Sequence, residues 1–444
     1  MAEMTIAGEN WWKPDPPPVR VVDTEADAGS RIAFWGLVAF TVILLLSPQT
    51  WFPALKIVRI AFLAAGLAGV VHIIEATARR RPIVLPSVES GLALALLTWA
   101  MLTTPYSVWV GGSLKLLTDQ YIKVFVFFWL IGTLVTTRER LRTVAWALAL
   151  CAIPLAGVAV QHYLSGDFLN TGTSNVKRIA GYTGLSGNPN DLALTLNLII
   201  PIAGVLLFTS KGIGARLAAG GALLLAVPAV VLTFSRAGFL TLGAIVILAL
   251  FWLARRRAAG LAIAVVIAVC AAIPFLPAGY MDRLNTITDI SADRTGSAQG
   301  RWKDFQVAIE VVAEHPIMGV GLGQDILALN EARGQKTWRS VHNAFLEYAV
   351  DLGLPGLFLF VALLVAAFRS TQLVVRYART RPEFTDLGTF GIGIQIALVA
   401  FAVAACFHPI AYQFYFFCVA GLAVSLKTAC RNEARAALAR AEAS

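Results

Sequence analysis

Three arginines in this 444-residue sequence are suited to binding a phosphate. Arg178, Arg236 and Arg301 each lie within three residues of a glycine, and Lys177 adjoins the first of them. A guanidinium can bind a phosphate through two parallel N–H groups, and a small neighbour lets the anion come close. The alternative interpretation is that these arginines contact lipid headgroups or pair with a nearby aspartate.

His342 is the candidate general base among the five histidines. Imidazole has an unperturbed pKa of about 6.5, so it can remove a proton from a hydroxyl near neutral pH. His342 stands where a long polar segment meets an apolar run, and nearby arginines should lower its pKa. Glu347 and Asp351 do not share its helical face, so any orienting group has to come from another element. The other interpretation is that His342 caps the following helix or donates a hydrogen bond to phosphate.

The composition argues against an ordinary soluble enzyme. Hydrophobic residues make up 58% of the chain, charged residues 14%, and the mean hydropathy is +0.72, whereas soluble domains are about 45–50% apolar and about 25% charged. The net charge of +10 comes largely from arginine clusters between apolar runs, which orient membrane helices rather than bind nucleic acid. No Cys-x-x-Cys pair or clustered acidic motif predicts a metal site, so we expect no metal and no other cofactor.

Twelve apolar runs predict an all-α polytopic membrane protein. A membrane-spanning helix needs about 20 mostly apolar residues, and the backbone of such a helix pairs within its own segment. The runs lack the alternation that is typical of barrel strands. The expected helices cover residues 32–48, 53–76, 87–104, 117–136, 141–162, 190–208, 217–234, 238–254, 258–277, 343–368, 385–406 and 409–427.

The distribution of lysine and arginine orients these helices, because cytoplasmic loops carry the excess of positive charge. The alternation of basic and less basic loops places the N-terminus inside. The chain is then organised as a cytoplasmic extension (1–31), nine helices (32–277), an outer loop domain (278–342), three further helices (343–427) and a cytoplasmic tail (428–444).

The outer loop is too long for a simple connector, so we expect it to fold. Trp302, Phe305, Ile309 and Val312 are spaced as one face of a helix, and a proline follows shortly after them. A second short helix is expected over residues 325–333.

Four stretches together resemble the O-antigen ligase and polymerase superfamily. Each stretch is short, but their order, and the long outer loop ahead of the histidine, are similar to that family over about residues 178–356. The stretches are Gly187-Asn188-Pro189-Asn190-Asp191-Leu192-Ala193, then Ser235-Arg236-Ala237-Gly238, then Gly300-Arg301 with Gly319-Val320-Gly321-Leu322-Gly323, and Val341-His342-Asn343-Ala344-Phe345-Leu346 with Gly353-Leu354-Pro355-Gly356.

The resemblance implies a bacterial inner-membrane glycosyltransferase with an active site that faces the periplasm. The donor would be a glycan on undecaprenyl diphosphate, and the acceptor of a ligase would be the lipid A–core of lipopolysaccharide. Direct displacement in one step would invert the anomeric centre, and the lack of a clustered acidic motif predicts a metal-independent transfer. In this sequence we expect His342 as the base, Arg236, Arg301 and Arg178 as diphosphate ligands, and Lys177, Asn188, Asn190 and Asn343 as possible substrate contacts.

Two other functions stay open at this stage. A repeat-unit polymerase for O-antigen or exopolysaccharide would use the same chemistry on another lipid-linked repeat. A transporter or flippase would instead need essential charges near the middle of the membrane, such as Asp119 and Lys123. A ligase or a polymerase instead needs essential cations on the outer side of the membrane.

The predicted topology can be tested by labelling single cysteines in intact spheroplasts. A cysteine placed between Tyr280 and Val341 should react with a membrane-impermeant maleimide, because that loop lies outside. A cysteine placed at Arg255 should react only after the membrane is opened. Labelling of position 255 alone in intact cells would invert the orientation and every site assignment that depends on it.

Overall fold

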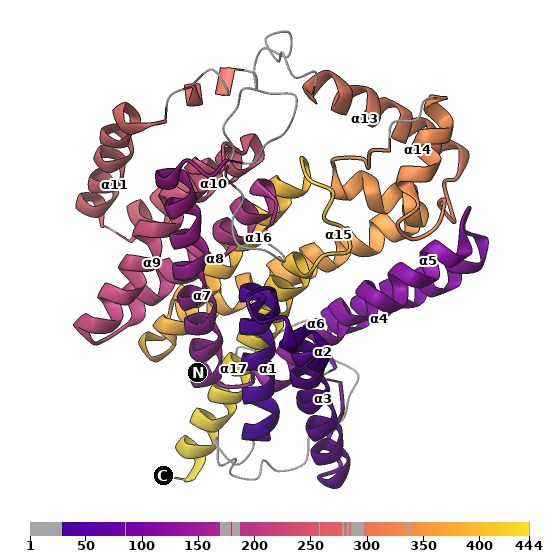
Figure 1. Cartoon of the computed structure of the whole chain (residues 1–444). Helices are drawn as coiled ribbons and strands as arrows, with labels where there is room; N and C mark the ends of the chain where they lie inside the picture. The colour runs from indigo at the N-terminus through magenta and orange to yellow at the C-terminus, as the bar shows by residue number, and fades with distance from the viewer. Residues whose placement is uncertain are drawn as a thin grey trace.

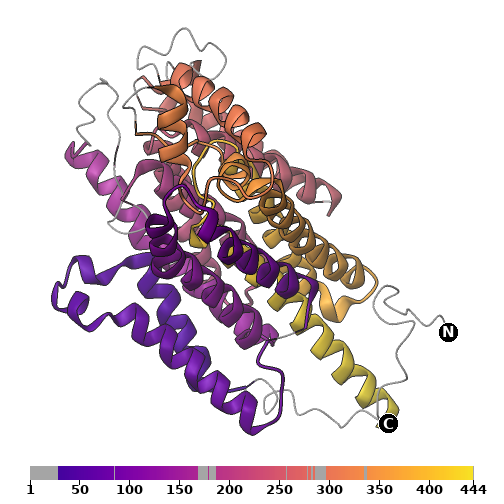
Figure 2. The same cartoon turned by 90° about the vertical axis from the view of Figure 1, so that its right-hand side faces the viewer.

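The protein is a bundle of long helices (Figures 1 and 2). The computed structural model describes residues 29–84, 86–168, 179, 187–256, 258–277, 279–281, 284–285, 297–334 and 338–443. All regular secondary structure in these ranges is helical. The candidate residues Lys177 and Arg178, and most of the N-terminal extension, lie outside the described residues.

Eight helices in the described ranges are long and apolar enough to cross a membrane, which confirms a polytopic helical membrane protein. They are α2 and α3 taken together (Ala54–Val58 and Ile60–Ala78), α7 (Arg138–Ser165), α8 (Pro189–Thr209), α9 (Ile213–Leu232), α10 (Arg236–Arg255), α15 (Ala344–Ala378), α16 (Thr385–Ala405) with the turn before it, and α17 (Phe414–Ala443). The number of twelve crossings stays a prediction, because the other apolar helices are shorter: α1 (Arg31–Leu46), α4 (Val88–Thr103), α5 (Val110–Leu116), α6 (Ile122–Leu134) and α11 (Ala259–Ala272).

Helices α8, α16 and α17 form the centre of the bundle. In their most apolar stretches 83%, 72% and 78% of residues are buried, against 11% for Ala54–Ala78. The helix Ala54–Ala78 therefore presents nearly all of its apolar surface outward, as expected beside lipid. Because α8 is the most buried of these helices, residues at its start are held by contacts with several neighbouring helices.

Three helices that carry candidate site residues begin with side-chain caps. The Oδ1 of Asn188 accepts from the backbone N–H of the second residue of α8 at 2.9 Å. Ser235 caps α10 through the Gly238 N–H at 3.1 Å, and Asn343 caps α15 through the Leu346 N–H at 3.0 Å. Asparagine and serine are favoured at this position because their oxygens satisfy an N–H that the helix leaves unpaired.

The segment between α11 and α15 contains two described helices, α13 (Ser297–Glu314) and α14 (Asp325–Arg333). Both lie at the end of the bundle away from the C-terminus of the chain (Figures 1 and 2). The helix expected around Trp302, Phe305 and Ile309 is present as α13, but Trp302 and Ile309 are 59% and 50% exposed. The buried face instead carries Asp304, Ala308 and Val311. It is turned inward by Asp304, whose carboxylate pairs with a buried arginine of α14.

A break in α15 receives the glycine-rich loop 319–323. At Gly353 the backbone adopts φ 68° and ψ −177°, which interrupts the helix. The carbonyl groups before such a break lose their helical partners and need others. They accept hydrogen bonds from outside the helix: Val320 N to Val350 O (2.9 Å), Gly321 N to Asp351 O (2.9 Å) and Trp99 Nε1 to Leu352 O (2.8 Å).

Replacing Gly353 by alanine should destabilise the protein far more than the same change at Gly334. Both glycines have positive φ angles, 68° and 59°, which cost an alanine on the order of 1–2 kcal/mol. At Gly353 the new Cβ would also lie 2.1 Å from the carbonyl oxygen of Ile317, whereas nothing lies within 4 Å at Gly334. Thermal unfolding of the two purified variants in detergent measures the difference. Equal melting temperatures would contradict the close packing of the loop against α15.

Candidate active site

The start of α10 is fastened to the start of α8. The hydroxyl of Ser235 donates to Asn190 Oδ1 at 2.7 Å. Gly238 lies so close to α8 that a Cβ there would be 2.6 Å from the Cβ of Ala193. Arg236, the first residue of α10, is half-buried. The sequence pattern Ser-Arg-Ala-Gly therefore places one candidate phosphate ligand beside the N-terminus of the central helix.

His408 connects the start of α8 to the loop between α16 and α17. Its Nε2 lies 3.1 Å from Oδ1 of Asp191, and only 8% of His408 is exposed. The positive charge that His408 can carry acts electrostatically on His342. Contacts thus run from Ser235 through the start of α8 to His408, and an electrostatic effect links His408 to His342.

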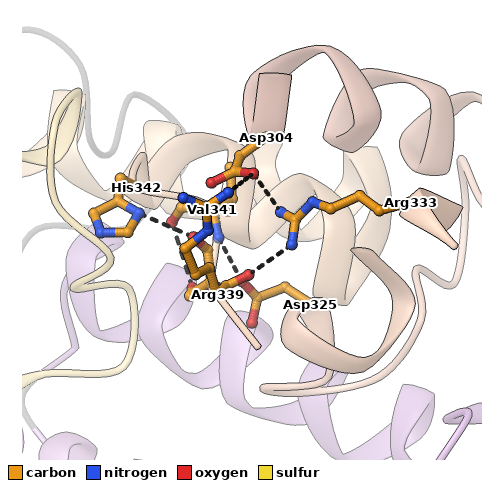
Figure 3. Close-up of polar contacts among 7 residues, drawn as sticks. Asp304, Asp325, Arg333, Arg339, Val341 and His342 are labelled. Carbon is orange, nitrogen blue, oxygen red and sulfur yellow. Dashed lines mark hydrogen bonds and ion pairs between the residues drawn. The ribbon is translucent and has the colours of Figure 1, made fainter. Parts of the chain in front are cut away.

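His342 is held in one tautomer by the backbone. Its Nδ1 lies 3.0 Å from the carbonyl oxygen of Ser340 (Figure 3). A carbonyl oxygen can only accept, so Nδ1 carries the hydrogen and Nε2 keeps a lone pair. Because Asn343 caps α15, capping the helix is not the task of His342. The arrangement leaves Nε2 as a proton acceptor.

Asp325, the first residue of α14, positions the segment that precedes His342. Its Oδ2 accepts from the hydroxyl of Ser340 at 2.5 Å and from the backbone N–H of Val341 at 2.9 Å (Figure 3). Only 3% of Asp325 is exposed, and this burial raises the pKa of its carboxyl. The group that orients His342 is therefore the backbone carbonyl of Ser340, in the segment before α15, and Asp325 holds that segment in place.

Asp304 of α13 forms ion pairs with two arginines of the segment that precedes His342. One of its oxygens lies 2.8 Å from Nη2 of Arg333 and 3.6 Å from Nη2 of Arg339 (Figure 3). The side chains of Asp304 and Arg333 are each 1% exposed, but that of Arg339 is 44% exposed. Arg333 is thus a structural ion pair, whereas Arg339 keeps enough accessible surface to meet a ligand.

Asp351 joins the glycine-rich loop to the loop that carries His408. It is fully buried, and its carboxyl accepts from the hydroxyl of Tyr412 at 2.8 Å. The same carboxyl accepts from three consecutive backbone N–H groups, those of Gly323 (2.8 Å), Gln324 (3.1 Å) and Asp325 (2.8 Å). Glu347 acts in a similar way by accepting from the Ala411 N–H at 3.1 Å. The two carboxylates that do not share the helical face of His342 are therefore the ones that hold its surroundings.

The pKa of His342 is lowered to about 4. Burial is the largest cause, since it disfavours the charged imidazolium, and the positive charge of Arg301 is the next. His408 and Arg339 add smaller effects in the same direction, while the hydrogen bond to the Ser340 carbonyl opposes them. The expected direction is thus found, but burial contributes more than the arginines. His342 is neutral at physiological pH.

The structure brings some of the expected residues together. The positive charge of Arg301 lowers the pKa of His342. Arg236 follows Ser235, whose hydroxyl donates to Asn190 at the start of α8. Asn188 and Asn343 cap their helices, and Asn190 accepts from Ser235 of the neighbouring helix start, so a role in sugar binding stays a prediction. Arg178 and Lys177 lie outside the described residues.

Sequence reasoning missed the residues that position the site. Asp304, Asp325 and His408 received no functional role, because each depends on a partner from a distant segment. Their one sequence signal is charge beside apolar residues in a segment that has to fold, which is too general to identify them. Among the described residues, no group of three His, Cys, Asp or Glu is placed to hold a metal ion, and metal independence stays a prediction.

Residues 221–361 match the O-antigen ligase family. This match supports the resemblance to the O-antigen ligase and polymerase superfamily that the sequence motifs indicate. The matched segment contains Arg236, Arg301 and His342, together with the positioning residues Asp325 and Asp351. A search of curated proteins found no significant match. The site thus lies within the ligase segment, with α8 and the α16–α17 loop as neighbours contributed from outside it.

Titration of His342 by chemical modification should report its depressed pKa. Diethyl pyrocarbonate reacts with neutral imidazole, so the modification rate at His342 should stay constant as the pH falls to about 5 and halve near pH 4. Arg301→Gln removes a cation that opposes protonation, so the midpoint should move to higher pH. Arg435→Gln, at the far end of α17, is the control and should leave the midpoint unchanged. The rate is read by mass spectrometry of the His342 peptide, with circular dichroism to check the fold at each pH. A wild-type midpoint at the free-imidazole value of about 6.5 would contradict the assignment.

Proposed function

We propose that this protein is an O-antigen ligase, which transfers a glycan from undecaprenyl diphosphate to lipid A–core during lipopolysaccharide biosynthesis. The observation that carries the proposal is the position of His342 in the O-antigen ligase segment. There a neutral imidazole with its Nε2 lone pair lies in the field of Arg301 and Arg339. We place the protein in the bacterial inner membrane, with this site facing the periplasm.

Arg236, Arg301 and Arg178 are proposed to bind the diphosphate of the donor, with Lys177 beside them. Helix N-termini add partial positive charge for the same anion, and α8 and α10 begin side by side. Cations at this position stabilise the negative charge that grows on the leaving diphosphate during transfer. The polyprenyl tail would remain in the lipid while the glycan reaches the aqueous loops.

The proposed reaction is a single displacement at the anomeric carbon. The acceptor hydroxyl oxygen attacks that carbon, the bond to the diphosphate oxygen breaks, and its electron pair leaves with the diphosphate. The hydroxyl proton passes to Nε2 of His342. Attack opposite to the leaving group inverts the anomeric centre, and no metal or other cofactor takes part. Asn188, Asn190 and Asn343 line helix starts where sugar hydroxyls would arrive.

Donor binding is proposed to tune the base. A pKa of about 4 keeps His342 neutral but makes it a weak proton acceptor. A bound diphosphate would supply opposite charge nearby, which raises the pKa of an imidazole towards neutrality. His342 then becomes an effective base once the donor is in place, which suits a catalyst whose proton acceptor works best near the ambient pH.

A repeat-unit polymerase is the alternative within the same chemistry, and the acceptor decides between them. A transporter or flippase receives less support. Asp119 and Lys123, the charges it was expected to use, are both exposed and form no ion pair with each other. Among the described residues, the loop that precedes His342 instead contains the ion pairs of Asp304 with Arg333 and Arg339.

Reconstitution with a diphosphate-linked glycan and lipid A–core tests the proposal. Arg236→Ala and Arg301→Ala should lose donor binding and transfer, and the lysine variants should keep part of both because lysine retains the charge but not the fork of N–H groups. His342→Ala should bind donor normally but transfer about 10²–10⁴-fold more slowly. His315→Ala, at the exposed end of α13, is the matched control and should remain active.

The products and the chelator arm decide between the alternatives. Glycan attached to lipid A–core supports a ligase, whereas elongation of the lipid-linked glycan would make the protein a polymerase. Full activity in the presence of a chelator is expected. A His342→Ala protein that transfers glycan at the wild-type rate would remove this residue from the mechanism.

A further inference from the structure

A second candidate site lies at the opposite end of the bundle from His342. An open cleft of about 820 Å³ is lined by residues of α10, α15 and α16. Arg236 begins α10 and the cleft lies around its last residue, Arg255. A helix of this length extends about 30 Å, so the cleft is separate from the proposed diphosphate site. The distribution of basic residues assigns this end to the cytoplasm.

Four arginines surround the mouth of the cleft, Arg255 and Arg256 from the end of α10 and Arg376 and Arg379 from the end of α15. All four are exposed, and none of the described residues that line the cleft is acidic. Asp386 attracts Arg256 from the first turn of α16 but does not line the cleft. The mouth of the cleft is therefore strongly positive and suited to more than one phosphate oxygen.

Two of these arginines are supported on aromatic rings. The guanidinium of Arg255 lies 4.2 Å from the ring centroid of Phe251, and that of Arg256 lies 4.8 Å from that of Trp252. Arg256 also donates to the hydroxyl of Thr389 at 2.8 Å. Such contacts restrict the positions of the two guanidinium groups. Tryptophan is enriched at the level of the lipid headgroups, so Trp252 is consistent with a position at that level.

Away from its mouth the cleft becomes apolar. Leu248, Phe368, Ile392 and Ile396 form its walls. The residues of α16 that line it extend from Thr385 to Val399, which corresponds to about 21 Å along a helix. One leaflet of hydrocarbon is about 15 Å thick, half of the bilayer core. The cleft is therefore long enough to follow a lipid from its headgroup into its acyl chains.

We propose that this cleft binds an anionic glycerophospholipid of the leaflet opposite the His342 site. The arginines bind the headgroup phosphate, and the acyl chains lie along the walls formed by α10 and α16. Gln372 of α15 lines the cleft one turn inward from Arg376, at the level of the ester carbonyls, to which its amide can donate. A zwitterionic lipid fits less well because none of the described lining residues carries a carboxylate to meet its cationic group. A free phosphate would leave the apolar walls uncovered.

Lipid binding to the delipidated full-length protein tests the proposal by native mass spectrometry. Dioleoylphosphatidylglycerol should bind tightly, while dioleoylphosphatidylcholine and glycerol 1-phosphate should bind weakly. Arg376→Gln with Arg379→Gln should weaken phosphatidylglycerol binding about 30-fold, from the usual contribution of two basic residues to anionic lipid binding. Arg435→Gln with Arg440→Gln removes two exposed arginines from the end of α17 and should leave the affinity unchanged.

Fluorescence quenching locates the bound lipid. Phosphatidylglycerol with brominated acyl chains should quench Trp252, so the quenched fraction should fall in Trp252→Phe. Equal binding of phosphatidylcholine would overturn the assignment to an anionic lipid, and equal binding of glycerol 1-phosphate would make this a site for free phosphate esters. An unchanged affinity in the Arg376→Gln, Arg379→Gln protein, or quenching that does not depend on Trp252, would place the lipid elsewhere.

Discussion

The buried carboxyl group of Asp351 is the constraint on which the site depends. A polar group that is removed from water costs several kcal/mol unless it is hydrogen-bonded. Here the compensation comes from three consecutive backbone N–H groups of residues 323–325 and from the hydroxyl of Tyr412. The loop can supply those groups only by turning tightly, and Gly321 and Gly323 do so with φ angles of 107° and 70°. The glycine-rich loop and the break in α15 thus form one unit.

A short series of hydrogen bonds connects this unit to His342 and fixes the position of the imidazole. The loop brings Asp325 to the start of α14, Asp325 holds Ser340 and Val341, and the carbonyl of Ser340 sets the tautomer of His342. The hydroxyl of Tyr412 donates to the same Asp351 carboxyl, which also holds the loop that contains His408. A general base has to be placed within hydrogen-bonding distance of its proton donor. A buried framework of this kind can provide such placement, whereas a free loop cannot.

The two ends of the bundle handle charge differently. Around His342 the arginines lie beside buried carboxylates that set their positions, and a neutral imidazole lies among them. At the other end Arg255, Arg376 and Arg379 surround an open cleft with apolar walls. The first arrangement is suited to stabilising charge that develops during a reaction, because its groups are already oriented. The second is suited to a ligand that stays bound and that brings its own apolar surface.

The sequence by itself determined the class of fold, the order of the helices and the segment that resembles the O-antigen ligase family. Hydrophobic runs and capping residues act locally, so α8, α10, α15 and the short helix Asp325–Arg333 could be predicted from the residues within them. The family motifs around Arg236 and His342 were visible for the same reason. Only the tertiary structure decided that α13 buries Asp304 rather than Trp302, that Asp351 organises the glycine-rich loop, and that His408 meets Asp191. These choices depend on polar groups from distant segments finding partners away from water, and the spacing of residues along one segment carries no information about a partner in another.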